Sequence, residues 1–591
     1  MKKRGRRRSL PASLPAAGAT VARVLPGVAG IDKEFDYLVP DEMLGAAAVG
    51  AEVRVDLHGR RVGGWITGLG EDPPAGLELR ALAKLRGWGP EPEVVDLAEW
   101  AAWRWASRRG AFLGTASPEH AVPELPPPRL QRAAPPASGW TAPAVEALPA
   151  GRAVVVRFPP AADPTVVVAA VSQVGPTLVV VPSASRAQVL SARLRRAGAS
   201  VALLPDQWAQ ARAGAGVVIG TRSAAWGPCP GLAAAVVIDG HDEALGQEQV
   251  PTWHAVQVLA ERAKRAGAGL VVLTACPTPE LVALGEVRLP DRAAERQGWA
   301  ALEVVDRRKE DPRSGLWSER LVELVRSTTK AACVLNRTGR ARLLACESCG
   351  ELARCERCGA SLLQAPGGQL ECPQCGLSRP VVCASCGSTV LRRLRIGVTR
   401  AREELEVLAG RSVGEVTAAT DRLPGDEVLV GTEALLRRLS PADGFGAVAF
   451  VDLDQELLAP RVRAGSEALA LLATASRLVG GRSGRVIVQT RVPEHPVVRS
   501  ALVADPGLLV EAEIGVREAL RFPPFAAVAV VSGEAAEVYV TQLAGLLVEV
   551  LGPRDGEWIV KASDYETLAD ALAAVPRPAG RLRIAVDPAR L

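Results

Sequence analysis

The sequence of 591 residues is poor in aromatic side chains, which make up 4% of it. Its cores must therefore be built mainly from Val, Leu and Ala. It has no apolar run long enough to span a membrane, and runs such as Thr177–Val181 have the length of buried strands. Met1–Leu10 contains six basic residues but no apolar core follows it, which excludes a secretory signal.

The chain also has little net charge. A balance of +5 over this length is weak evidence for a polyanionic partner, so any DNA binding must come from local basic surfaces. Residues 1–14 are expected to form a basic tail, either a solvated arm or a non-specific phosphate contact. The length predicts roughly three to five domains.

The first part of the chain changes its pattern twice. Residues 15–88 are expected to form a β-rich unit, because Glu52–Leu57 and Arg61–Ile66 suit half-buried strands. Residues 89–122 take on a helical period around three Trp side chains. Residues 123–140 are rich in proline and predict a linker.

Two stretches alternate apolar runs with helical segments, which is typical of a parallel α/β sheet. The first covers residues 141–325, and the second covers residues 396–499. Residues 500–591 mix helices and strands and predict an α+β domain. The strands expected in these stretches are Ala153–Val156, Val166–Val171, Thr177–Val181, Val217–Ile219, Ala234–Ile238, Leu270–Leu273, Glu427–Val430, Ala447–Val451, Ala526–Val531 and Leu582–Val586.

A cysteine-rich module is expected at residues 326–395, where it interrupts or immediately precedes the second α/β lobe. Eight of the eleven cysteines form CxxC pairs there, and without an export signal this indicates metal binding in a reducing cytoplasm rather than disulfides. A glycine follows each pair, which suits a turn of positive φ. The pairs are Cys346/Cys349, Cys355/Cys358, Cys372/Cys375 and Cys383/Cys386.

Two such pairs complete a tetrahedral site of four thiolates, so the module predicts two closed structural zinc sites. Iron–sulfur ligation fits this even, glycine-flanked spacing less well. Spacing alone permits either sequential or nested pairing. Arginines crowd the module, and either solvent or DNA phosphate could face them; Arg337 and Arg340 are the candidate DNA contacts.

Several short segments follow one another along the chain, with the eight cysteines between them. The segments are Phe35–Pro40, Val218–Ala224, Val334–Arg340, Ile396–Leu405, Val430–Glu433, Gln489–Pro496 and Arg521–Phe525. In this order they resemble the PriA family of replication restart proteins, and their collinearity makes the resemblance specific.

The resemblance implies two RecA-like helicase lobes, an N-terminal domain that binds DNA 3′ ends, a winged-helix unit at 89–122 and a C-terminal α+β domain. It also implies nested pairing, with zinc 1 on Cys346, Cys349, Cys383 and Cys386, and zinc 2 on Cys355, Cys358, Cys372 and Cys375. Phe35, Asp36 and Tyr37 would contact the 3′ end, an aromatic ring stacking on a base. The alternative is that Phe35 and Tyr37 only pack a small core.

The nucleotide site departs from the family pattern. An ATP-driven helicase needs a glycine-rich loop ending in Lys-Ser/Thr, but Arg157–Asp163 offers neither and has two prolines that remove backbone donors. Asp239 could still hold a metal, but Gly240 stands where the acidic residue that positions water is expected. The sequence does not decide which arginine of Ala475–Arg485 would be the finger. We therefore predict a degenerate helicase with no catalytic or nucleotide-binding residues.

These observations predict a cytoplasmic factor that binds stalled or abandoned forks and their 3′ ends. By the resemblance, it would promote primosome assembly together with helicase-loading proteins and single-stranded DNA-binding protein. One alternative is an active ATP-dependent 3′–5′ helicase with a divergent nucleotide site. The other is a zinc-knuckle interaction scaffold that does not bind DNA directly.

Overall fold

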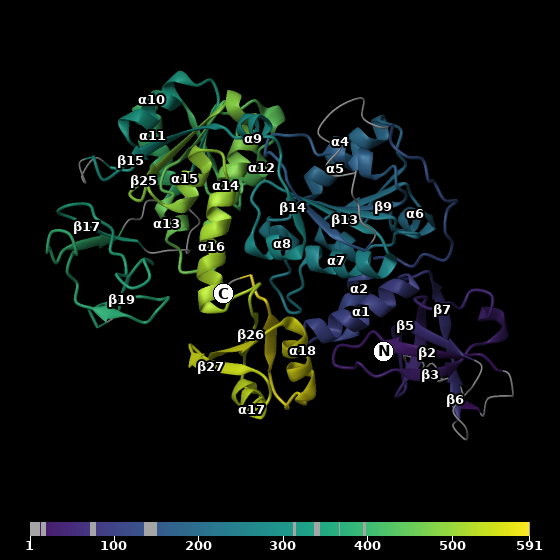
Figure 1. Ribbon diagram of the computed structural model, residues 1–591. Coiled ribbons are helices and arrows are strands. Elements are labelled where there is room, and N and C mark those ends of the chain that lie inside the picture. The colour runs from purple at the N-terminus through teal and green to yellow at the C-terminus, as the bar shows by residue number, and fades with distance from the viewer. Residues whose placement is uncertain are drawn as a thin grey trace, which may run out of the picture.

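The computed structural model describes residues 12–13, 19–70, 78–134, 151–310, 315–335, 343–365, 367–393 and 397–589. Two α/β lobes lie side by side, and the cysteine module projects from one of them (Figure 1). The N-terminal sheet and the C-terminal domain lie along one side of the lobes (Figure 1). Among the described residues, no helix combines the length and apolar composition that crossing a membrane requires.

The N-terminal unit is a seven-stranded sheet in the order β1-β6-β3-β2-β5-β4-β7. The two segments whose alternation predicted strands form β4 and β5, which pair antiparallel. Small β-branched and aliphatic side chains, among them Val24, Val53 and Ile66, make its core. The strands are β1 (Ala12–Ser13), β2 (Val21–Pro26), β3 (Phe35–Leu38), β4 (Glu52–Leu57), β5 (Arg60–Gly70), β6 (Leu79–Ala81) and β7 (Lys84–Gly87).

Two helices, α1 (Pro92–Arg104) and α2 (Arg109–Ala116), join this sheet to the first lobe. An aromatic side chain of α2 packs against one of lobe 1, since the ring centroids of Phe112 and Trp226 lie 5.1 Å apart. A winged helix needs a third helix and a β-hairpin, and the described residues between 89 and 122 contain neither. The winged-helix unit therefore stays a prediction, because the described residues show only two of the elements that such a unit needs.

Lobe 1 is a seven-stranded parallel sheet in the order β10-β11-β9-β12-β13-β8-β14. Its central strands are buried along their length, as sheets covered on both faces require. The strands are β8 (Ala153–Arg157), β9 (Thr177–Val180), β10 (Val201–Leu203), β11 (Val217–Gly220), β12 (Ala234–Ile238), β13 (Gly269–Thr274) and β14 (Glu286–Arg288). The helices are α4 (Thr165–Val171), α5 (Ala184–Arg196), α6 (Trp208–Ala213), α7 (Ala255–Ala266) and α8 (Pro279–Leu284), with the 3-10 turns η2 (Arg222–Trp226) and η3 (Glu243–Leu245).

The strand expected at Val166–Val171 is wrong, because this segment is helix α4. A short, continuous apolar run looks the same whether it forms a buried strand or a buried helix. The Asp163 carboxylate accepts the backbone N–H of Thr165 at 3.0 Å, which favours a helical start. Val167 and Val168 are fully buried, so these apolar side chains of the helix pack in the core of lobe 1.

Lobe 2 is a six-stranded parallel sheet in the order β15-β25-β24-β16-β23-β22. Its strands are β15 (Ala301–Asp306), β16 (Ala331–Val334), β22 (Val413–Val416), β23 (Val428–Gly431), β24 (Ala447–Phe450) and β25 (Arg485–Thr490). Its helices are α10 (Glu319–Ser327), α11 (Val398–Ala409), α12 (Ala434–Arg438), α13 (Asp454–Leu457), α14 (Ala464–Leu478), α15 (Pro496–Leu502) and α16 (Gly507–Leu520), with η4 (Pro441–Asp443) and η5 (Gly481–Ser483).

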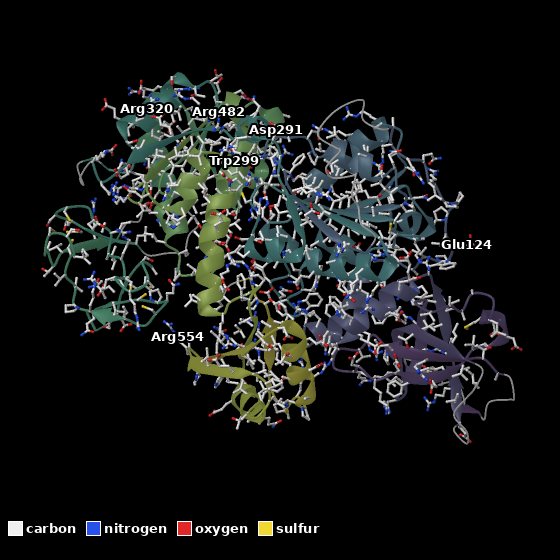
Figure 2. All side chains as sticks on the ribbon, in the orientation of Figure 1. Glu124, Asp291, Trp299, Arg320, Arg482 and Arg554 are labelled. Carbon is white, nitrogen blue, oxygen red and sulfur yellow. The ribbon has the colours of Figure 1, made fainter. Side chains whose placement is uncertain are left out.

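The observed boundary between the cysteine module and lobe 2 differs from the predicted one. Because β15 and β16 belong to the lobe 2 sheet, that lobe begins near residue 301 rather than at 396. The module is therefore an insertion between β16 and α11. Helix α9 (Arg292–Gly298) connects the lobes, and Figure 2 places Asp291 and Trp299, at its two ends, where they meet.

Short antiparallel strands build the module, and an antiparallel sheet builds the C-terminal domain in the order β27-β28-β26-β29. The module strands are β17 (Leu344–Cys346), β18 (Leu363–Gln364), β19 (Leu370–Glu371), β20 (Ser378–Arg379) and β21 (Leu391–Arg393). The C-terminal elements are β26 (Ala527–Ser532), α17 (Ala536–Gln542), β27 (Glu549–Arg554), β28 (Glu557–Ala562), α18 (Tyr565–Ala574) and β29 (Arg583–Val586), so the α+β expectation agrees with these elements.

Candidate metal centres and DNA-binding surface

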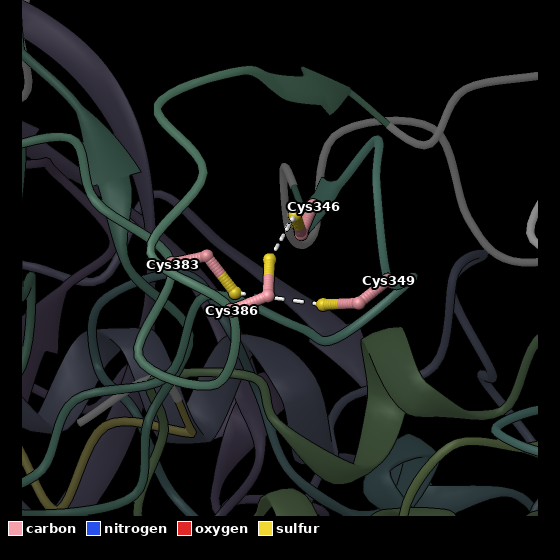
Figure 3. A group of neighbouring side chains, drawn as sticks. All are labelled: Cys346, Cys349, Cys383 and Cys386. Carbon is pink, nitrogen blue, oxygen red and sulfur yellow. Dashed lines mark hydrogen bonds between the residues drawn. The ribbon is translucent and has the colours of Figure 1, made fainter.

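The outer two CxxC pairs of the module converge on one point (Figure 3). The sulfurs of Cys346 and Cys386 lie 3.5 Å apart, and those of Cys349 and Cys383 lie 3.6 Å apart. All four sulfurs lie within 4.8 Å of one another. The inner pairs repeat this arrangement, with 3.5 Å between Cys355 and Cys375 and 3.4 Å between Cys358 and Cys372.

Each tetrad could hold a metal ion. Four thiolates at about 2.3 Å from a tetrahedral zinc would have sulfurs about 3.8 Å apart, close to the observed separations. The grouping is the nested one that the resemblance implied. The glycines after the pairs have φ of 75°, 75°, 74° and 74°, so the expected positive-φ turns are confirmed at Gly350, Gly359, Gly376 and Gly387.

The backbone of the turns favours thiolates in the tetrads. Burial raises the pKa of the Cys346 thiol, but the N–H groups of Cys349 and Ser348, together with the neighbouring thiols, lower that pKa to about 6. In the same tetrads, burial and the neighbouring thiols raise the pKa of Cys349 and Cys358 to about 12, although a backbone N–H lowers each of them. The N–H of Leu377 lowers the pKa of Cys375 to about 7. Metal ligands must be deprotonated, so these turns suit a cation.

The three predicted 3′-end contacts lie together on β3. Tyr37 is buried in the core of the small sheet and donates a hydrogen bond to the Asp56 carbonyl at 3.3 Å. Burial raises the pKa of its phenol. Phe35 is half-buried, and the Asp36 carboxylate lies 3.6 Å from the Arg23 guanidinium. Of the two aromatic rings, only Phe35 keeps a partly exposed face. The other predicted contacts, Arg337 and Arg340, lie outside the described residues.

A cavity of about 530 Å³ separates α2 from the carboxyl edge of lobe 1. It lies where β9 and β11 end and where α5 begins, with Ser183 as the N-cap of that helix. Val218–Ala224 is one of the segments that resemble the PriA family, but its sequence pattern does not indicate that its polar side chains line a cavity. The polar residues that line the cavity are Thr115, Ser183, Thr221, Arg222, Ser223 and Gln247.

After β12, the strand next to β9 in the same sheet, protein groups surround Asp239. One carboxylate oxygen accepts from Arg477 of lobe 2 at 2.7 Å, and the other accepts from Arg186 of α5. Both oxygens are engaged by guanidiniums, so a metal ion at Asp239 would have to compete with Arg477 and Arg186. Of the arginines in Ala475–Arg485, Arg477 reaches this carboxylate. Arg482 is exposed (Figure 2), and Arg485 lies 3.5 Å from Glu303.

Comparison with known proteins identifies the chain. The family model described as the 3′ DNA-binding domain (3′BD) of PriA matches residues 22–118. The "Probable replication restart protein PriA" of Mycobacterium leprae is 30% identical over 586 residues, which cover 85% of this chain and 86% of that protein. The chain belongs to the PriA family.

More distant PriA relatives match part of the chain. The replication restart protein PriA of Thermotoga maritima is 28% identical over 394 residues, 61% of this chain and 53% of that protein. Among solved structures, S. cerevisiae Dbp5 bound to RNA and ADP BeF3 is similar to this chain with a TM-score of 0.36 and 12% identity, covering 62% of this chain and 89% of that one. The PriA 3′BD match runs past residue 88 and includes both α1 and α2.

Gly240, in the position where the PriA pattern expects an acidic residue, has no room for a side chain. A Cβ there would lie 2.3 Å from Val272 Cγ1. We expect Gly240→Glu to destabilise lobe 1 by about 1–3 kcal/mol without creating ATP hydrolysis. Thermal unfolding and ATP turnover measure this. Gly425→Ala is the control, because nothing lies within 4 Å of a Cβ at that position. An unchanged melting temperature for Gly240→Glu would contradict the steric argument.

Three histidines predict loss of stability in mild acid. Burial lowers the pKa of His241, His254 and His495 from 6.5 to about 4. Since the unfolded chain binds protons first, stability is present above about pH 6.5 and falls as the pH drops toward 4, by up to about 1.4 kcal/mol per pH unit for each group. Denaturant unfolding between pH 7.5 and 5 measures the slope.

A matched variant isolates one of these histidines. His254 Nδ1 accepts the backbone N–H of Val256 at the start of α7, at 3.3 Å. Asn also caps a helix but does not titrate in this range, so His254→Asn should flatten the pH dependence. An identical slope in the variant and the parent chain would show that His254 does not contribute.

Proposed function

We propose that this chain is a replication restart protein that recognises forked DNA and its 3′ end and promotes assembly of the primosome. The match to the PriA 3′ DNA-binding domain at residues 22–118 carries this proposal, because it lies within a chain that is similar to a PriA protein along most of its length. The half-buried Phe35 and neighbouring Asp36 on β3 are the proposed 3′-end contacts, with Arg337 and Arg340 as phosphate contacts.

The cavity beside α2 supports a continuous DNA path from this domain to lobe 1. Its hydroxyls, the guanidinium of Arg222 and the N-terminus of α5 are the groups that recognise phosphate oxygens. Thr115 comes from the 3′BD match, and Ser183 and Thr221 come from lobe 1. A strand leaving the 3′-end site would therefore meet both units at once.

We propose that two zinc ions stabilise the fold of the cysteine module, with one ion bound in each tetrad. The tetrads have four protein ligands each and thus no open position for catalysis, which favours a structural role. Exposed Arg354 and Arg357 lie on the module surface. We propose this surface as the site that meets helicase-loading proteins and single-stranded DNA-binding protein at the fork.

The proposed role does not include unwinding. The segment after β8 lacks the phosphate-binding loop, and the Asp239 carboxylate is engaged by two arginines. We therefore expect no ATP turnover on forked DNA. Release of labelled phosphate above the background of a protein-free control would show that the chain is an active helicase instead.

Fork binding tests the proposal directly. We expect tighter binding to a fork with a leading-strand 3′ end at the junction than to the same fork without it, measured by fluorescence anisotropy at several salt concentrations. Equal affinity for both forks and for plain duplex would contradict recognition of the 3′ end.

One variant tests the cavity. Arg222→Gln removes one phosphate contact, so binding should weaken for all forks and the salt slope should fall by about 1. The control is Arg196→Gln, an exposed arginine at the far end of α5 whose Nε bonds only within its own helix, to the Ala192 carbonyl at 3.3 Å. If both variants lost the same affinity for forked DNA, the loss would come from the lower overall charge and not from the cavity.

A further inference from the structure

The carboxyl ends of β8, β12 and β13 face lobe 2. In open α/β sheets this edge is where ligands bind, because loops and helix N-termini converge there. The residues at these ends are Arg157, Asp239 and Thr274. Each of these side chains has a protein partner, and two of the partners come from lobe 2.

Arg477 makes the central contact across the lobes. It lies on α14 of lobe 2, yet its Nη2 donates to Asp239 at 2.7 Å and its Nε donates to the Pro160 carbonyl at 2.8 Å. Pro160 belongs to the segment after β8, where a nucleotide-binding protein presents backbone donors to phosphates. Here that segment instead presents a carbonyl acceptor to an arginine.

Arg157, the last residue of β8, makes a second contact of the same kind. Its guanidinium pairs with Glu295 of α9 and donates to Asp505 at 3.0 Å. Asp505 lies between α15 and α16, on the lobe 2 side. Arg292 of α9 adds hydrogen bonds to the carbonyls of Val503 and Ala504 in the same turn.

The backbones of the two lobes also touch at this place. Gly481 of η5 is so close to the connection between the lobes that a Cβ would lie 2.4 Å from the Gln297 carbonyl and 3.1 Å from Ala161 Cβ. A Cβ on Gly298 would lie 2.4 Å from Pro159 Cβ. Loop 158–162, helix α9 and η5 therefore pack directly on one another.

We infer that Arg477, Asp239, Pro160, Arg157 and Asp505 form an inter-lobe latch that holds the two lobes closed without nucleotide. The latch places a lobe 2 guanidinium and a lobe 1 carboxylate where a nucleotide-driven protein would alternate between bound and empty states. The lobes then form one fixed platform. This inference goes beyond the proposed function, since it concerns the lobes alone and would stand even if fork recognition failed.

Charge and burial explain why the latch stays closed. The Asp239 side chain is 8% exposed and accepts from two guanidiniums, so opening the lobes would remove one partner from a buried carboxylate. It would also leave the Pro160 carbonyl without its arginine donor. Breaking a buried pair costs more than exposing a surface pair, so the open form is disfavoured. A nucleotide would have to displace Arg477 and separate packed backbone at once.

Amide hydrogen exchange of the full chain, without DNA, tests the latch. In the parent chain we expect strong protection of residues 481–484 and of Phe158, Ala161 and Ala162, the residues of loop 158–162 that have an amide hydrogen. This protection should be unchanged by 1 mM Mg·ATP, and a fluorescent ATP analogue should not bind. Arg477→Ala should raise exchange in both segments at least several-fold. Arg482→Gln, which changes an exposed arginine of η5, should leave the exchange unchanged.

A second variant keeps the test decisive if Arg477→Ala does not fold. Asp239→Asn preserves the shape of the side chain but removes the charge that both arginines contact, and it should raise exchange in the same two segments. Unchanged exchange in a folded variant would overturn the latch. Saturable binding of the ATP analogue to the parent chain, with increased exchange in either segment, would overturn it as well.

Discussion

Cys355→Ser is expected to reduce the zinc content from two ions per chain to one and to unfold the inner half of the cysteine module. Cys355 is 3% exposed and belongs to the small core formed with Leu362, Leu370 and Cys372, so its sulfur serves both the tetrad and the packing. A serine hydroxyl is a poor substitute for a thiolate ligand. Structural zinc contributes on the order of 10 kcal/mol to modules of this kind. Zinc content by elemental analysis and limited proteolysis measure the two effects.

Cys333→Ser provides the matched control. Cys333 is fully buried on β16 of lobe 2 and belongs to neither tetrad. The substitution should lower the melting temperature somewhat, because it buries a hydroxyl, but it should leave two zinc ions bound. Two ions in Cys355→Ser, or one ion in Cys333→Ser, would contradict the assignment of the inner tetrad.

The sequence predicted best the features whose signal is local. Each CxxC pair is followed by a glycine, and all four glycines have the positive φ that this pattern indicated. The continuous apolar runs of the lobes became strands, except at Val166–Val171. The apolar composition of that segment correctly predicted burial, but its periodicity did not distinguish a helix from a strand. A buried segment without a polar face shows neither period.

The sequence could not predict contacts between distant segments. Arg477 and Asp239 are 238 positions apart, and no local pattern distinguishes Arg477 from Arg482 or Arg485. The start of lobe 2 was misplaced for the same reason. The strand β15 pairs with β25, which lies beyond the cysteine module in the sequence, so only the folded sheet shows that residues 301–306 belong to that lobe.

A second charged cluster joins three parts of the molecule, and Glu280 of α8 is its centre. The Glu280 carboxylate accepts from Arg463 of lobe 2 at 2.9 Å and from Arg517 of α16 at 2.7 Å. Arg463 also donates to Asp587 of the C-terminal domain at 2.9 Å. Burial raises the pKa of Glu280, but the two arginines outweigh burial and lower it to about 2. The carboxylate is therefore ionised throughout the range in which the protein would be studied.

Glu280→Ala is expected to destabilise the chain by about 3 kcal/mol, because Arg517, 2% exposed, would lose an anionic partner in a buried site. The remaining partners, Glu513 and Asp587, keep the loss near the lower end of the range for broken buried pairs. Denaturant unfolding at pH 7.5 measures it. Glu286→Ala, in which the lost carboxylate is 66% exposed, should change stability by less than about 1 kcal/mol. Equal losses in the two variants would show that Glu280 acts as an ordinary surface carboxylate and does not join lobe 1 to its neighbours.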